Sequence, residues 1–143
     1  MGSKSNYLEL NVLDAILGAG FTAPGTVYWA LFSATPSDTG GGTELTSGTA
    51  PGYARLAATN NTTNFPNATT NGTSGLGEKK VGVAQTFAAN SSGTTDWPTV
   101  VAFGLLDAST AGNLLLWSAV APLAITPAAQ FVIPANAVFW TED

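Results

Sequence analysis

Residues 99–120 read TVVAFGLLDASTAGNLLLWSAV and contain the strongest fold signal in the chain. Residues 99–107 are almost continuously apolar, which is typical of a strand buried on both faces. Residues 108–112 supply a short turn, and residues 113–120 return as a second apolar strand whose end we expect at Pro122. The stretch therefore predicts a hairpin inside a β-sheet.

Further strand signals lie on both sides of this hairpin. Each is a short run that alternates or is rich in β-branched and aromatic residues, and turn residues separate the runs. The runs cover residues 26–34, 53–59, 80–88, 130–133 and 137–141. Within one of them, Val81, Val83, Gln85 and Phe87 are expected on the same side of a strand. Strands at this spacing predict a mainly β fold, either a β-sandwich or a jelly roll.

The length of 143 residues and the lack of an internal repeat indicate one β-sandwich domain over residues 1–143. Two segments within it differ from the rest. Residues 1–18 form an N-terminal arm and helix. Residues 60–77, which are rich in Asn, Thr, Gly and Ser, form a long polar loop or a pair of short edge strands.

Residues 5–18 are the segment with helical periodicity. Its apolar positions are Leu8, Val12 and Ile16, with Leu13 and Leu17 beside them. Ser5 or Asn6 can cap the start, and Gly18 suits the end. The apolar stripe can cover the chain's own sandwich, or it can reach a neighbouring copy or a different subunit beneath it; we favour the chain's own sandwich, with Tyr7 and the polar residues 1–6 reaching outward to a partner. Deletion of residues 1–6 would then leave the fold intact.

The charge content is unusually low. Charged residues make up 9% of the chain, against roughly 25% in an average soluble domain, and the net charge is −5. The four basic residues, Lys4, Arg55, Lys79 and Lys80, are too few for a phosphate-binding patch, so nucleic acid is not an expected partner. No apolar run reaches the length of about 18 residues that a membrane-spanning helix needs, so no membrane partner is expected either.

Chemistry-bearing residues are scarce. The chain has no His and no Cys, which removes the most common general base, the thiol nucleophile and the usual zinc ligands. Asp38 and Glu44 flank a Gly-rich turn and could bind Ca²⁺, but solvated turn residues explain them as well. We therefore predict no enzymatic activity, no cofactor and no metal site.

Four tryptophans are many for this length, and they have two interpretations. Aromatic residues anchor interfaces and sugar sites, but they also fill cores. Trp29 and Trp117 lie inside apolar strands and are expected in the core. Trp97 and Trp140, near a turn and a terminus, are interface candidates together with Tyr7.

Several short strings resemble a group of small structural proteins of tailed phages. They are Tyr7-Leu8-Glu9, Val27-Tyr28-Trp29-Ala30-Leu31-Phe32, Gly52-Tyr53-Ala54-Arg55, Trp97-Pro98-Thr99-Val100, Phe103-Gly104, Asn113-Leu114-Leu115-Leu116-Trp117 and Phe131-Val132-Ile133-Pro134. The resemblance covers nearly the whole chain apart from residues 60–77. Members of this group resemble capsid decoration (cement) proteins in some phages and carry tail-fibre labels in others.

The resemblance implies a non-enzymatic cement protein on the capsid surface of a virion. Its partners would be the major capsid protein and further copies of itself, with a homotrimer at local three-fold positions. The alternative is a tail-fibre or baseplate protein that binds host glycans through exposed aromatic residues. A free carbohydrate-binding module is a third hypothesis, for which the tryptophan content is the argument. Copy number in the virion separates the first two.

Overall fold

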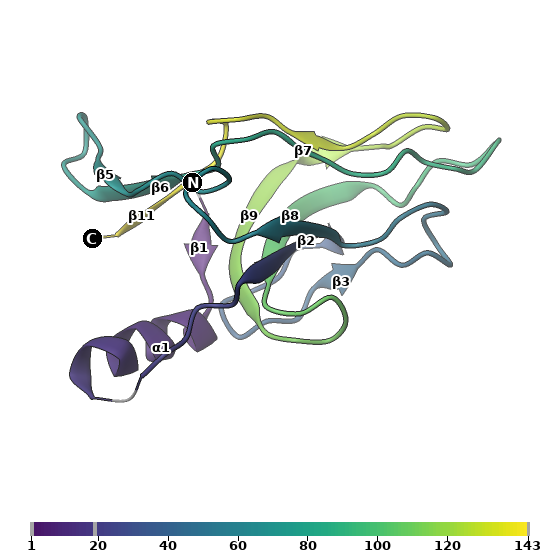
Figure 1. Ribbon diagram of the computed structural model, residues 1–143. Coiled ribbons are helices and arrows are strands. Elements are labelled where there is room, and N and C mark those ends of the chain that lie inside the picture. Colours follow the sequence, from purple (N-terminus) through teal and green to yellow (C-terminus); the bar gives the residue numbers. More distant parts are fainter. Residues whose placement is uncertain (1, 19, 143) are drawn as a thin grey trace.

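The predicted hairpin forms the middle of a six-stranded antiparallel sheet in the computed structural model, which describes residues 2–18 and 20–142 (Figure 1). Its two arms are β8 (Val100–Leu106) and β9 (Leu114–Leu123). The long strand β2 (Thr26–Ala34) pairs with the other side of β8. All three strands are rich in apolar residues; β2 and β8 are buried along most of their length, whereas β9 is buried at Leu115 and Ser118.

Short strands complete both edges of this sheet. β3 (Thr43–Glu44) and β4 (Leu56–Thr59) pair with opposite ends of β2, and β1 (Ser3–Lys4) pairs with β9. The expectation that residues 1–6 form an outward-reaching arm is therefore wrong. The edge of β9 offers unpaired backbone groups, and residues 3–4 satisfy them as an edge strand.

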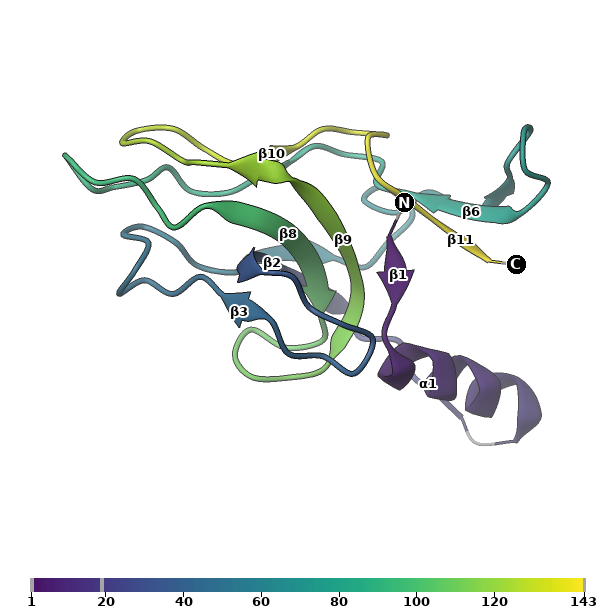
Figure 2. The same cartoon turned by 180° about the vertical axis from the view of Figure 1, so that it is seen from behind.

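A second group of strands packs against the large sheet, with β7 and β10 running over it and β6 and β11 extending past its β1–β9 side (Figure 2). It contains the three-stranded sheet of β5 (Thr69–Thr70), β6 (Gly77–Lys80) and β11 (Phe139–Glu142), and the two-stranded sheet of β7 (Gln85–Thr86) and β10 (Val132–Ile133). Residues 60–77 are mainly loop and turn, and they contain the edge strand β5 and the first residue of β6, which is the middle strand of its sheet. The mainly β fold with one short helix is confirmed, and its layers are those of a β-sandwich.

The core between the layers is centred on Trp29, which is fully buried. Its ring lies 6.3 Å from Phe65, 5.7 Å from Phe103 and 6.1 Å from Trp140, measured between ring centroids. Aromatic pairs at such distances add to the stabilisation from burial alone. A smaller cluster around Phe32 lies on the other face of the sheet, below the Gly-rich loop and the β8–β9 turn.

Three details of the strand prediction are wrong. Strand β9 continues past Pro122, because the residue lies where the β8–β9 register shifts and a missing N–H is tolerated there. Residues 80–88 are not one strand, because β6 ends at Lys80 and β7 begins at Gln85, and between them Gly82 passes so close to Pro66 that a Cβ would lie 2.6 Å from it. Val83 consequently points to solvent. Residues 53–55 precede β4, and Tyr53 turns into the core.

Candidate interaction surface

Helix α1 (Asn6–Leu17) begins where β1 ends, and its first residues are fixed to the sandwich. The buried Ser5 caps the helix by accepting a hydrogen bond from the Leu8 N–H at 3.3 Å. The Ser5 hydroxyl donates to the Leu114 carbonyl, and its N–H donates to the Leu115 carbonyl at 2.9 Å. Asn6 N–H donates to the Asp38 carbonyl at 2.8 Å. The start of α1 is therefore fixed in position, and of the two predicted caps, Ser5 and Asn6, the structure uses Ser5.

Beyond this anchored start, α1 projects away from the strands (Figures 1 and 2). None of its residues is buried. Leu8 packs partly against the core, but Leu10, Leu13, Ile16 and Leu17 are 63%, 56%, 71% and 81% exposed. The expectation that the apolar stripe covers the chain's own sandwich is thus wrong for most of the helix. The reason is geometric, because the helix leaves the sandwich at its edge and runs outward.

The exposed leucines of α1 have a regular spacing. Leu10, Leu13 and Leu17 are separated by three and four residues, which places them on one side of the helix; we call them the outer seam. Glu9 and Asp14 border the outer seam along its two edges, and α1 carries no basic residue. The helix thus presents an apolar strip with an acidic border on each side.

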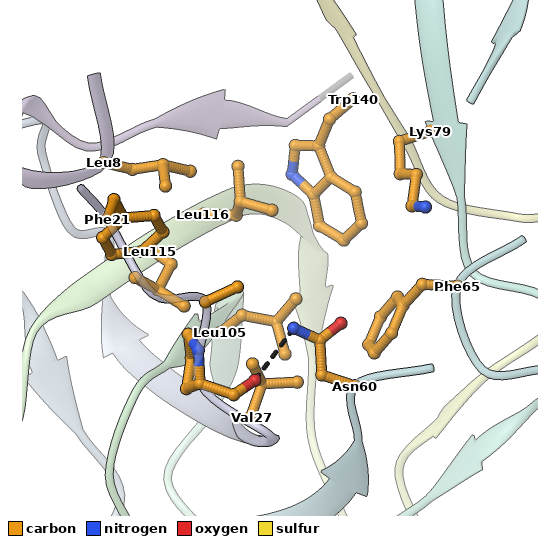
Figure 3. Close-up of a pocket in the computed structure, with 12 residues that line it drawn as sticks. Leu8, Phe21, Val27, Asn60, Phe65, Lys79, Leu105, Leu115, Leu116 and Trp140 are labelled. Atoms are coloured by element: carbon orange, nitrogen blue, oxygen red, sulfur yellow. Dashed lines mark hydrogen bonds between the residues drawn. The ribbon is translucent and has the colours of Figure 1, made fainter. Parts of the chain in front are cut away.

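Two apolar hollows lie at the foot of α1. The first, of about 170 Å³, is drawn in Figure 3, where Leu8, Phe21, Leu115, Leu116, Phe65 and Trp140 surround the space. The second, of about 220 Å³, lies between α1 and the β5–β6–β11 sheet. Both are lined by Leu8, Lys79, Leu116 and Trp140, and we call the two together the basal groove. The basal groove is the apolar surface of the sandwich that lies nearest to the helix.

A third hollow, on another side of the helix start, is polar. It has a volume of about 480 Å³ and is lined by the exposed Tyr7 together with Asp38, Thr39 and Asn113. Asp38 also accepts a hydrogen bond from the Trp117 indole N–H at 3.3 Å. Thr39 and Asn113 likewise have side-chain partners, in Ser37 and Asp107, so the exposed Tyr7 ring is the part of this hollow with most surface left for a ligand.

The other two aromatic interface candidates lie in the core. Trp97 is 2% exposed and donates its indole N–H to the Pro51 carbonyl at 2.9 Å. Trp140 is 6% exposed and stacks on Trp29. Their positions next to a turn and a terminus suggested exposure, but each turns inward because its large ring fills the space between the layers. Of the three candidates, Tyr7 alone has an exposed side chain, and the structure does not bring the three together.

The largest polar cluster holds loops together. Arg55 donates to both Glu44 carboxylate oxygens, at 2.8 and 2.7 Å, and to the carbonyls of Ala108 and Ala111 in the β8–β9 turn. Tyr53 donates to Glu44 at 3.0 Å, and burial raises the pKa of its hydroxyl above its ordinary value. Glu44 is thus already paired, and it is not poised to share a Ca²⁺ ion with Asp38.

A second ion pair lies beside the basal groove. Glu78 accepts from Lys80 at 2.8 Å and from the Asn71 side chain at 2.6 Å, and these two contacts lower the pKa of Glu78. Lys79, which lines both hollows, forms no ion pair with any residue that the structure describes.

Across residues 2–18 and 20–142, no three His, Cys, Asp or Glu side chains lie close enough to hold a metal ion. In the same residues, no helix has the length and apolar character that crossing a membrane requires.

Sequence reasoning missed the outer seam as a surface. The sequence places Leu13 and Leu17 beside the stripe that is expected to cover the sandwich, and the stripe does not include Leu10. One signal was present, since the apolar positions of residues 5–18 occupy more of the helix circumference than a single buried stripe requires. A helix with two apolar sides can contact two partners.

The fold and this surface define a mainly β structural protein with an uncovered apolar helix. The family model of podophage GP4 fiber I protein gp80 matches residues 3–141. The chain belongs to this family, and it is a structural protein of a phage virion. No curated protein sequence matches it.

Proposed function

We propose that this chain is a non-enzymatic subunit of a phage tail fibre, and that helix α1 attaches it within that assembly. The description of the family supports the fibre rather than the capsid shell. One structural observation carries the proposal, namely the uncovered apolar side of α1 with its leucines at Leu10, Leu13 and Leu17. Contiguous apolar surface of this kind marks interaction sites in soluble proteins.

The positions of the acidic side chains support a non-enzymatic role. Glu44 is held by Arg55, Glu78 by Lys80, and Asp107 accepts from the Asn113 backbone and side chain at 2.7 and 2.8 Å. Each of these carboxylates fixes a loop or a turn. None is paired with a nucleophile or a second carboxylate in the manner of an acid–base site.

Location and copy number in the virion test the proposal. Antibody labelling of intact particles in the electron microscope is expected to mark the tail, and quantitative mass spectrometry is expected to give a few to some tens of copies per particle. Labelling spread over the capsid, with hundreds of copies, would contradict the fibre proposal. That result would support a cement protein bound to the major capsid protein.

Glycan contact is a second candidate function, favoured by the polar hollow beside Tyr7. An aromatic ring next to several hydrogen-bonding groups is the usual composition of a sugar site. Binding of the full chain to host-surface glycans on an array, lost in Tyr7→Ala and kept in Tyr28→Ala, would support it. Equal binding by both variants, or no binding, would contradict it.

A further inference from the structure

The basal groove offers a place for the outer seam of a neighbouring copy. We propose that α1 of one copy docks its outer seam into the basal groove of a second copy of this chain. This inference rests on the proposed role as an assembly subunit and names the partner of α1. Three features of the molecule support it: the shape of the groove, the charges around both surfaces, and the area that an interface needs.

The groove has room for side chains from a helix. Its hollows measure about 170 and 220 Å³, and cavities of about 150 Å³ are large enough to bind benzene. The two hollows share Leu8, Lys79, Leu116 and Trp140 in their walls, so they are neighbours on the surface. Side chains three or four residues apart on a helix are neighbours, so Leu13 and Leu17 of another copy can enter adjoining hollows.

Charge favours the groove over the simplest alternative, in which two α1 helices pair with each other. Glu9 and Asp14 border the outer seam on both edges, so pairing of two outer seams brings acidic residues together in either orientation. The basal groove instead carries Lys79, which has no ion-pair partner among the described residues. Glu78 also lines the groove, but Lys80 neutralises it. The acidic border of the helix and Lys79 are therefore complementary.

The surface area that a stable interface buries also favours docking of the helix in the groove over pairing of two helices. A helix of twelve residues is about 18 Å long, and a pair of such helices covers far less than the ~800 Å² per partner of a stable interface. A copy that both gives a helix and receives one buries two surfaces. Self-association of this kind therefore uses both apolar surfaces of the chain, and it gives a reciprocal dimer, a ring or an open helical filament.

Analytical ultracentrifugation of the full chain over a range of concentrations tests self-association. The wild type is expected to associate reversibly, and the double variant Leu13→Ser/Leu17→Ser is expected to weaken association about hundredfold, because two large apolar contacts are lost. The matched control is Leu123→Ser, which replaces an exposed leucine of β9 outside both surfaces and should leave association unchanged. A wild type that stays monomeric, or a double variant that associates normally, would overturn the proposal.

Charge reversal distinguishes the groove from any other acceptor. Lys79→Glu is expected to weaken association about tenfold, and adding Glu9→Lys and Asp14→Lys to it is expected to restore association. A merely structural role for Lys79 would not be rescued by changes on the helix. Failure of Lys79→Glu to weaken association, or failure of the rescue, would overturn docking in the groove.

Cross-linking supplies a direct distance test, because the natural chain has no cysteine. A chain with Leu13→Cys is mixed with a chain carrying Ala68→Cys, which lines the second hollow, and treated with a short bis-maleimide. A cross-linked heterodimer is expected, whereas Thr94→Cys in a remote loop should give none. Equal cross-linking of the Leu13→Cys chain to the Ala68→Cys and Thr94→Cys chains would contradict the proposal. A monomeric chain that is nevertheless found in the tail would refute this inference and leave the fibre role standing.

Discussion

Large apolar side chains make up both the Trp29 core and helix α1, but those of the core are buried and most of those of α1 are exposed to solvent. Trp29 contacts aromatic rings on several sides and is fully buried. The three leucines of the outer seam are instead more than half exposed. Apolar content alone therefore does not separate residues that pack inside a subunit from residues that stay exposed on it.

The largest expected effect comes from the core. Trp29→Ala should destabilise the chain by about 3–5 kcal/mol, because it removes a fully buried ring and leaves a cavity between the layers. The free energy of unfolding from urea titration measures the change. A loss below about 1 kcal/mol would mean that Trp29 does not hold the two layers together.

A smaller loss is expected from the polar cluster of Arg55. Arg55→Met should cost about 1.5–3 kcal/mol, because Glu44 loses its charged partner and the carbonyls of Ala108 and Ala111 lose their donor. Urea titration again measures it. Arg55→Lys serves as a comparison, since a lysine keeps the charge but cannot reproduce the bidentate contact, and an intermediate loss is expected. Equal stability of all three proteins would show that the cluster does not stabilise the fold.

The outer seam should behave in the opposite way to the core. Leu13→Ser/Leu17→Ser should change the free energy of unfolding of the dilute chain by less than about 1 kcal/mol, since both side chains are exposed and only helix propensity is affected. Thermal melts at low protein concentration measure this. Destabilisation as large as that of Trp29→Ala would mean that α1 packs on its own sandwich.

The smallest effect is expected from pH. Lys80 and Asn71 lower the pKa of Glu78 in the folded chain from the ordinary value of 4.5. The stabilisation from these contacts is therefore complete above about pH 4.5, and it is lost as the pH falls through the lowered pKa. Glu78→Gln should flatten this part of the stability profile between neutral and acidic pH. An unchanged profile would assign the pH dependence to other carboxyls.

The strands of the large sheet could be predicted from sequence because their signals are local. Residues 26–34 form β2 with the expected bounds, and the apolar runs of residues 99–107 and 113–120 contain β8 and most of β9. The cap at Ser5 and the helix end at Gly18 follow from side-chain and backbone chemistry within one turn.

The interaction surface could not be predicted in the same way, because exposure depends on where an element lies in space. The apolar periodicity of residues 5–18 shows that α1 needs a partner but not which one. Trp97 and Trp140 lie next to turn residues in the sequence, but contacts with Tyr53 and Trp29 bury them. Long-range packing decides these cases.

The role of α1 in assembly is tested most directly by hydrogen exchange at residues 6–17. In the dilute chain the amides of α1 should exchange much faster than those of β2 and β8, because the helix is short and uncovered. On self-association, or in fibres isolated from virions, the same amides should become protected. If α1 is already as protected as β8 in the dilute chain, or stays unprotected after assembly, the helix is not an assembly element.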